Sequence, residues 1–362
     1  MGRDRLGEYN RKRSFRATPE PEGGSRKGGG GERFVVQQHD ATALHWDLRL
    51  ERDGTLASWA LPRGIPLDPD DDRLAVRTED HPLEYLEFEG TIPKGQYGAG
   101  VMEIWDRGTY EVEKFEPAKV VARFDGERLR GRYALFRIRK SGERTDSWLI
   151  HRMDPPEAGR ERMPDGLRPM VAKRGKLPRD PSGWAFEILW SGRRALGYAR
   201  PGELLLHDPD GAVLQAQLPE VRRAARSLGS TEAILDGIAI AFDADGRPDP
   251  ERLARRLEPA SDSTVRRRAR SDPVALVLFD LPFLEGEALC DEPYEERRAR
   301  LTDLPLDGEV LQVPAHHVGD GGRLLEAAKQ RGLPGVVAKR LGSAYRPRTR
   351  SEDWVEIRAG SR

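Results

Sequence analysis

The segment QQHDATALHWDLRLE, residues 37–51, carries the residue types and the spacing best suited to chemistry. On an extended strand His45, Asp47 and Arg49 point to one face, because side chains alternate between the two faces. The opposite face is apolar and suits a core: Leu44, Trp46, Leu48 and Leu50. His39 lies six residues before His45 and would converge on the polar face from the strand entrance. We therefore predict a metal site formed by His39, His45 and Asp47.

Two imidazoles and one carboxylate form a borderline-soft ligand set, which suits Mn, Fe, Co or Zn better than Mg or Ca. Two chemistries stay open on these residues alone: a non-haem iron oxygenase, which uses two histidines and a carboxylate, or metal-assisted phosphoester hydrolysis. Arg49, Arg63 and Arg73 favour a phosphate substrate, although oxygenases also hold acidic cosubstrates with arginine. The alternative without chemistry is an amphipathic strand whose polar face only meets water.

A second polar cluster follows in RTEDHPLEYLEFEG, residues 77–90. His81 precedes Pro82, which favours extended backbone, and Glu79 and Tyr85 lie close in sequence. An imidazole with a pKa near neutrality suits a proton donor or a phosphate contact. A turn histidine that only satisfies a backbone group remains the alternative.

The pattern around these clusters predicts two domains. Residues 34–154 form short β-like runs separated by Gly, Pro and Asp, which is typical of a small barrel or sandwich. Residues 155–169 are polar and rich in Pro and Gly, as expected for a linker. From residue 170 to 360 helical and strand-like runs alternate, which indicates an α+β domain. Residues 1–31 are basic and contain the run GGSRKGGGG, which predicts a mobile arm.

Composition excludes several classes of protein. The 362 residues suit two domains, and 61 Lys+Arg balance 61 Asp+Glu, so a uniformly basic DNA-coating protein is not expected. Cys290 is the single cysteine, which excludes an internal disulfide framework and favours a reducing cytoplasm. The sequence has no apolar run of membrane-spanning length and no signal-peptide pattern, so we expect neither a membrane protein nor a secreted one.

On these residues, the segment from Phe34 to Asp154 resembles the 3′-phosphoesterase domain of bacterial DNA ligase D. The resemblance rests on FVVQQHDATALHWDLRLE, on SWALPRGIPLDPDDDRLAVRTEDHPLEYLEFEGTIPKGQYGAG, on SWLIHRMD, and on LGEYNRKRSFRATPEPEG in the leader. It implies a compact all-β barrel that trims DNA 3′ ends bearing a phosphate or a terminal ribonucleotide. The implied metal is manganese, with cobalt or another divalent ion as a substitute.

The resemblance also assigns individual residues. His39, His45 and Asp47 would hold the metal, while Arg49 and His81 would flank the transferring phosphoryl group. The remaining positions assigned to the site are Arg13, Glu20, Arg63, Arg73, Glu79 and Tyr85. Arg63 stands where the family usually has Lys and still provides a cation. Ser14 stands where the family typically has Asp, a change expected to weaken ribonucleotide removal more than phosphate removal.

From about Arg168 to Arg358 the chain resembles the adenylation domain of ATP-dependent DNA ligases, which has an α+β nucleotidyltransferase fold. That family carries a nucleophilic Lys followed two residues later by Asp and Gly, and here EILWSGRR places Leu189 at the lysine and Ser191 at the aspartate. Leucine cannot attack the α-phosphate of ATP, so we predict no covalent use of ATP. Further departures from the family motifs are Ile238, Pro334, Glu356 and Arg358.

Two other features of the second domain bear on its function. Lys339 is expected to be a phosphate contact rather than a substitute nucleophile. The run RRRAR, residues 266–270, indicates a solvated basic loop, with contact to a DNA backbone as the functional alternative. The OB-fold module with which ligases close on DNA is expected to be absent.

The sequence thus predicts a manganese-dependent 3′-phosphoesterase that heals DNA ends in double-strand-break repair by end joining, fused to a degenerate ligase domain. Expected partners are DNA 3′ ends at primer–template junctions or breaks, together with the Ku end-binding protein and a separate ligase or polymerase. The expected location is the cytoplasm, at the nucleoid. The alternatives are a non-catalytic DNA-end adaptor and an active ATP-dependent ligase, which Leu189 argues against.

Overall fold

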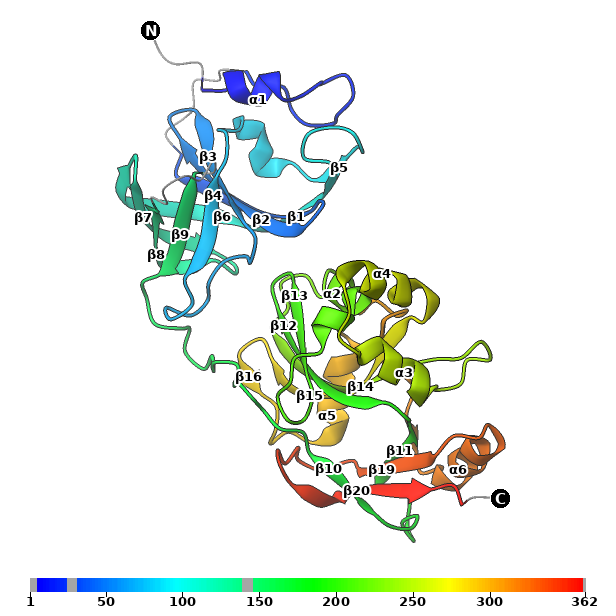
Figure 1. Cartoon of the computed structure of the whole chain (residues 1–362). Coiled ribbons are helices and arrows are strands. Elements are labelled where there is room, and N and C mark those ends of the chain that lie inside the picture. The colour runs from blue at the N-terminus through cyan, green and yellow to red at the C-terminus, as the bar shows by residue number, and fades with distance from the viewer. Residues whose placement is uncertain (1–4, 25–30, 139–145, 361–362) are drawn as a thin grey trace. The chain divides into compact units, whose positions relative to one another are not determined.

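The computed structural model describes residues 5–24, 31–138 and 146–360. Its contacts divide the chain into two compact units, Met1–Ala158 and Gly159–Arg362, which we describe separately (Figure 1). Most of the glycine-rich run predicted as part of a mobile arm, residues 25–30, lies outside the described residues.

The first unit contains a closed barrel of eight antiparallel strands, as the sequence predicted. Its strands are β1 (Arg33–Asp40), β2 (Leu44–Arg52), β3 (Thr55–Leu61), β4 (Arg73–Arg77), β6 (Gly100–Glu116), β7 (Lys119–Gly126), β8 (Arg130–Arg137) and β9 (Ser147–Arg152). They follow the order β1-β2-β3-β4-β9-β8-β7-β6, and β6 pairs with β1 to close the sheet, while β5 (Gly90–Ile92) adds to the edge of β6.

The barrel interior is apolar because its strands alternate apolar and polar residues. Trp46, Trp59 and Trp148 are among its largest buried side chains. In the sequence, Gly108 divides the segment of β6 into two shorter β-like runs. In the structure the strand continues through this glycine without a turn. A Cβ there would lie 2.2 Å from the carbonyl oxygen of Asp125, so the glycine permits close approach to β7.

A second apolar layer covers the outer face of β1. It combines Tyr9 of α1 (Gly7–Arg11), Tyr85 of the short helix η1 (Leu83–Glu87), Ile92 of β5 and Val35 of β1. Tyr9 is fully buried, and its hydroxyl donates to the carbonyl of Pro21 at 2.6 Å. The expectation of a mobile arm is therefore corrected for residues 5–24, because an aromatic anchor fixes this part of the leader.

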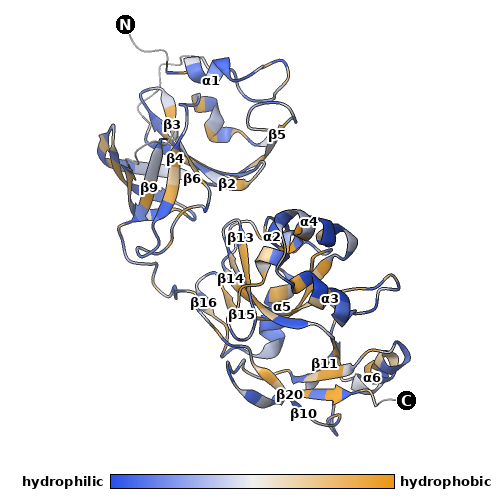
Figure 2. Cartoon of the chain, in the orientation of Figure 1, coloured by the Kyte–Doolittle hydropathy of each residue, from blue (hydrophilic) through white to orange (hydrophobic). Residues whose placement is uncertain are grey.

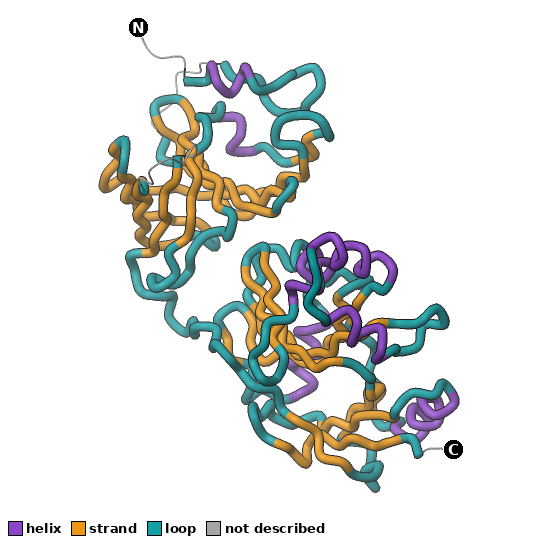
Figure 3. Tube along the Cα trace, in the orientation of Figure 1, coloured by secondary structure: helices purple, strands orange, loops and turns teal. Residues whose placement is uncertain are grey.

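The second unit is an α+β fold with two sheets (Figure 3). One sheet has the order β10-β20-β19-β11-β18, and the other has the order β13-β12-β14-β15-β16 with β17 beside β15. The first is built from β10 (Val171–Arg174), β11 (Trp184–Leu189), β18 (His317–Val318), β19 (Gly335–Arg340) and β20 (Arg350–Arg358). The second is built from β12 (Arg193–Arg200), β13 (Glu203–His207), β14 (Ala233–Ala241), β15 (Val274–Leu284), β16 (Glu287–Ala288) and β17 (Leu311–Gln312).

The helices of this unit include two that the sequence did not predict, the short η2 and α4. They are η2 (Gln215–Gln217), α2 (Pro219–Ala224), α3 (Pro250–Leu257), α4 (Asp262–Ser271), α5 (Tyr294–Thr302) and α6 (Gly321–Gln330). The run RRRAR, expected as a basic loop, lies in α4. That helix was missed because Val265 is its only buried side chain, so it lacks an apolar stripe.

The segment expected as a linker belongs in part to the second unit. Met163 is buried beside Phe283, and the amide of Glu161 donates to the carbonyl of Gly286 at 2.7 Å. None of the described helices is long and apolar enough to cross a membrane.

Candidate active site

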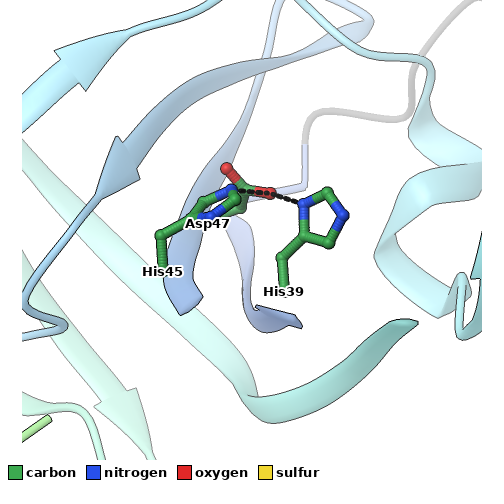
Figure 4. Close-up of side chains that lie close together, drawn as sticks. All are labelled: His39, His45 and Asp47. Carbon is green, nitrogen blue, oxygen red and sulfur yellow. Dashed lines mark ion pairs between the residues drawn. The ribbon is translucent and has the colours of Figure 1, made fainter. Parts of the chain in front are cut away.

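Paired strands bring His39, His45 and Asp47 together on the outer face of the barrel. His39 of β1 stands directly opposite His45 of β2, and Asp47 follows on the same face. One ligand atom from each residue lies within 4.8 Å of the others. The Oδ2 atom of Asp47 is 3.7 Å from Nδ1 of His39 and 3.9 Å from Nε2 of His45 (Figure 4).

In each imidazole, the nitrogen that faces away from Asp47 is hydrogen-bonded to a backbone carbonyl. Nε2 of His39 donates to the carbonyl of Gly98 at 2.9 Å, and Nδ1 of His45 donates to the carbonyl of Ala43 at 2.9 Å. These bonds fix the tautomers so that the nitrogens facing Asp47 carry lone pairs. Two neutral imidazole nitrogens and one carboxylate fit a divalent transition metal.

Arg49 provides a buried positive charge beside this set. Its Nη2 donates to Asp47 at 3.0 Å and its Nε to Oε1 of Gln37 at 2.7 Å. Burial by itself raises the pKa of Asp47, but the positive charge of Arg49 opposes it, and that pKa lies well below its usual value. The third nitrogen, Nη1 of Arg49, is buried and has no partner among the described residues. A buried guanidinium with one unused donor is suited to bind a phosphoryl oxygen.

The sequence interpretation missed Gln37, which orients Arg49. The Gln37 amide donates to the carbonyls of Tyr85 and Phe88 at 3.1 and 2.8 Å, which leaves its oxygen directed at Arg49. One signal was present: Gln37 lies two residues before His39 and therefore on the same strand face.

The leader contributes Arg13 to the site. Its guanidinium donates to Glu20 at 2.6 Å and to Glu79 at 3.0 Å, and it reaches Nε2 of His81 at 3.3 Å. Lys12 pairs with the other oxygen of Glu79 at 3.0 Å. Three of the predicted positions, Arg13, Glu20 and Glu79, are thus one buried ion-pair network.

His81 and Tyr85 lie between this network and Arg49. Nδ1 of His81 donates to the carbonyl of Glu79 at 2.9 Å, so Nε2 accepts from Arg13. Burial and the charges of Arg49 and Arg13 lower the pKa of His81 far below its ordinary value, which keeps the ring neutral. The hydroxyl of Tyr85 donates to Glu20, and its ring lies 4.8 Å from the Arg49 guanidinium.

Arg63 and Arg73 lie in or beside the loop between β3 and β4. Arg73 donates to Asp71 and to the carbonyls of Arg63 and Ile65, and so ties down the loop between β3 and β4. The side chain of Arg63 is exposed on that loop. These hydrogen bonds give Arg73 a structural task in the loop.

In the second unit, Leu189 is the last residue of β11 and is half-buried opposite Gly335. The neighbouring buried cation, Lys339, pairs with Glu187 at 2.8 Å and donates to the carbonyl of Phe279 at 3.1 Å. The hydroxyl of Tyr294 occupies the other oxygen of Glu187 at 2.6 Å.

A second buried network surrounds Asp236, which precedes Gly237. Arg194 donates two hydrogen bonds of 2.6 and 2.5 Å to the Asp236 carboxylate, and the hydroxyl of Tyr345 donates to the same carboxylate at 2.6 Å. Burial raises the pKa of Asp236 against the opposing effect of Arg194. The buried charges named here, on Lys339, Glu187, Arg194 and Asp236, are each satisfied within the protein.

Comparison with known proteins agrees with this division. Residues 37–137 match the family described as the DNA ligase D 3′-phosphoesterase domain, and residues 169–358 match the ATP-dependent DNA ligase domain. The chain belongs to the family of the ATP-dependent DNA ligase domain, whose match covers more than half of its length. Its similarity to curated DNA ligase D proteins extends over 98% of its length, so both units are included.

Two curated DNA ligase D relatives illustrate the similarity. The chain is 40% identical over 359 residues to the multifunctional non-homologous end joining protein LigD of Mycobacterium bovis and 39% identical over 405 residues to that of Pseudomonas aeruginosa. Each match covers 98% of this chain but only 45% and 47% of the relative, so the chain spans about half the length of these proteins. The solved ligase domain of M. tuberculosis LigD is 33% identical, with a TM-score of 0.46, and covers 53% of this chain and 60% of that one.

Proposed function

We propose that the chain is a metal-dependent 3′-phosphoesterase that heals DNA 3′ ends during end joining. It removes a 3′-phosphate and also a terminal 3′ ribonucleotide. The observation that carries the proposal is the group of His39, His45, Asp47 and Arg49, all buried except the partly exposed His45, in which two imidazole lone pairs, a carboxylate and one unused guanidinium donor converge. The family match to residues 37–137 supports the same chemistry.

Each residue of this group has a definable task. His39, His45 and Asp47 would hold manganese, or cobalt as a substitute, and a divalent ion there supplies positive charge that polarises a phosphoryl oxygen. Arg49 binds a second phosphoryl oxygen through Nη1, and Gln37 and Asp47 fix its orientation beforehand. Arg13 holds the neutral ring of His81 beside Arg49. We keep Arg63 as a further cation of the site and Arg73 as a residue that supports the site from the loop between β3 and β4.

The decisive test is release of 3′-phosphate from a recessed primer–template by the purified protein, with manganese, with EDTA and with His45→Ala. We expect manganese-dependent release that falls at least about 100-fold in the variant, because a ligand nitrogen is lost. His151→Ala is the matched control, since His151 lies on β9 of the same barrel and only contacts Asp72 at its surface. Equal activity of His45→Ala and wild type would refute the proposal, and binding without turnover would favour a DNA-end adaptor.

We further propose that the second unit, Gly159–Arg362, is a ligase domain without ligase activity. Leu189 has no nucleophilic atom, and Lys339 is committed to Glu187 and the carbonyl of Phe279. Incubation with labelled ATP is expected to leave no AMP on the protein. A stable adduct would overturn this part of the proposal.

The biological setting belongs to the same proposal. The substrates are DNA ends at primer–template junctions or breaks, in the cytoplasm at the nucleoid. The lost ligase activity requires a separate ligase, and the Ku protein and a polymerase are the expected partners at a break. Co-purification from cells with damaged DNA, compared with undamaged cells, tests this association.

A further inference from the structure

One face of α4 carries the most concentrated unpaired positive charge that we find in the second unit. Ser263, Arg266, Arg267, Arg270 and Ser271 line a shallow, open hollow at this helix. Their spacing is i, i+3, i+4, i+7 and i+8, which places all five on one side of an α-helix. In a soluble helix this spacing normally marks an apolar stripe, but here it marks hydroxyl and guanidinium groups. Figure 2 shows α4 as one of the most hydrophilic elements of the unit.

The arginines of α3 and α4 divide into two sets according to what they contact. Arg256 is buried against Glu220 at 2.6 Å, Arg252 pairs with Asp272 at 3.1 Å, and Arg268 donates to the carbonyl of Arg255 at 2.6 Å. These side chains attach the two helices to each other and to the unit. Structural needs therefore account for this set.

The second set consists of the outward-facing Arg266, Arg267 and Arg270, and no contact within the protein explains these side chains. Arg266, Arg267 and Arg270 are exposed, and no ion pair or hydrogen bond joins their side chains to any other described residue. The acidic neighbours do not neutralise them, because Asp272 is engaged by Arg252 and Asp262 is the one carboxylate within α4. Three adjacent guanidinium groups remain, in a chain whose formal net charge is zero.

This arrangement fits a phosphate backbone. Arg266 and Arg270 are separated by about 6 Å along the helix axis, at 1.5 Å per residue, which is close to the rise of about two nucleotides in one DNA strand. Arginine donates to phosphate oxygens in a fork, so the three guanidinium groups carry the contact. The hydroxyl of Ser271 already donates to Asp272 at 2.8 Å, and that of Ser263 lies 3.1 Å from the hydroxyl of Ser261. The group contains no aromatic side chain, so it offers no surface for stacking unpaired bases.

We propose that the arginine face, consisting of Ser263, Arg266, Arg267, Arg270 and Ser271, binds the backbone of duplex DNA without reading its sequence. The degenerate ligase domain thereby keeps a function, which is to hold the duplex that carries the end to be trimmed. The inference rests on the proposed action on DNA ends. It adds to that proposed function a DNA-contacting surface in the second unit, where Leu189 stands at the position of the nucleophilic lysine.

The test compares two triple variants of the full chain. One replaces Arg266, Arg267 and Arg270 with Gln. The matched control replaces Arg323, Lys329 and Arg331 with Gln, which removes the same charge from exposed positions on or beside α6. Binding to a short blunt duplex is followed by fluorescence anisotropy over a range of salt concentrations.

We expect the α4 variant to bind about tenfold or more weakly at low salt, and its log–log salt slope to be shallower by about 2 to 3, because about three phosphate contacts are lost. Every duplex sequence should be affected equally, and the control should keep wild-type affinity. Retained far-ultraviolet circular dichroism and an unchanged Tm would establish that the variant is folded, as expected for exposed side chains.

Unaltered affinity and slope in the α4 variant would overturn the inference, as would an equal loss in the control. Loss of binding to anionic lipid vesicles with unchanged DNA binding would assign the surface to a membrane and would also overturn it. The outcomes of this binding test can be distinguished from those of the phosphoesterase test. If wild type binds DNA through α4 but releases no phosphate, the proposed function fails and this surface stands.

Discussion

Two buried charge clusters, one in each unit, differ in what they leave unsatisfied. Around Asp47, two imidazole nitrogens carry free lone pairs and Nη1 of Arg49 has no partner. Around Glu187, Lys339 and Tyr294 occupy both carboxylate oxygens. The first cluster therefore has two lone pairs and a donor free for a ligand. In the second cluster neither oxygen of Glu187 is free, although Nε of Arg298, whose Nη1 lies 3.7 Å from Glu187, has no partner among the described residues.

The difference indicates how a site and a scaffold can be distinguished within one chain. Burying an unpaired donor costs about 1–3 kcal/mol or more for a charged group, so each such donor needs an explanation. For Nη1 of Arg49, which lies beside two imidazole lone pairs and a carboxylate, a phosphoryl ligand would supply one. A fully paired cluster contributes to a defined fold and needs no ligand. The comparison predicts that substitutions in the first cluster affect turnover and those in the second affect stability.

The strongest challenge to this comparison is Arg49→Lys. We expect a loss of phosphate release of about 100-fold or more, because lysine keeps the charge but cannot donate to Gln37, Asp47 and a phosphoryl oxygen together. The measurement is kcat with saturating 3′-phosphate substrate. Arg52→Lys on the same strand, where the side chain is partly exposed, is the control and should keep activity. Full activity of Arg49→Lys would remove the guanidinium from the mechanism.

For a fully paired buried charge in the second unit, Asp280→Asn should lower the free energy of unfolding by about 3–5 kcal/mol. Asp280 and Arg297 form a fully buried pair at 2.7 and 3.0 Å, and the substitution leaves the guanidinium without its counter-charge. Denaturant unfolding measures the effect. Lys173→Ala, which breaks an exposed pair with Glu352, should change stability by less than about 1 kcal/mol. Similar effects of the two variants would show that the buried pair is not structural.

A smaller effect is expected where the leader meets the barrel. Arg13→Gln should reduce phosphate release by about tenfold to 100-fold, because it removes the group that holds His81 while the metal ligands stay in place. Arg16→Gln, on an exposed part of the leader, should have no effect. If Arg13→Gln were as active as wild type, the leader would contribute to stability only.

The same contact gives a pH dependence. Burial raises the pKa of Glu79, but hydrogen bonds from its own backbone amide, Arg13 and Lys12 lower it below the usual glutamate value. A carboxyl with a depressed folded-state pKa stabilises the fold above its unfolded value of about 4.5, and this contribution is lost as the pH falls through the folded value. Glu79→Gln should therefore flatten the acid limb of a stability–pH profile. An unchanged acid limb would contradict the assignment.

For the last substitution we expect no change in the transfer of AMP to the protein. Leu189→Lys should not restore transfer of AMP from labelled ATP, because Ser191 still replaces the family aspartate and Glu187 remains occupied by Lys339. Autoradiography of the denatured protein measures this. A labelled band in Leu189→Lys would show that one substitution separates this domain from an active ligase.

The sequence by itself determined which residues share a face. Strand alternation grouped His45, Asp47 and Arg49 opposite a row of apolar residues, and that row lies in the barrel core. Turn residues and alternating runs were enough to predict an all-β domain, either a barrel or a sandwich, and the resemblance to a known family selected the barrel. Helical and strand-like runs were enough to predict an α+β second domain. Local periodicity depends on the chain's immediate neighbours, so it can be read without the fold.

Only the tertiary structure decided how the grouped residues are held. Gln37 fixes Arg49, the carbonyls of Gly98 and Ala43 set the histidine tautomers, and Arg13 reaches His81 across 68 positions of sequence. The arginines of α4 likewise separate into paired and unpaired sets only when the folded contacts are known. Hydrogen-bond partners distant in sequence are selected by long-range strand pairing and burial, and these leave no periodic trace in the sequence.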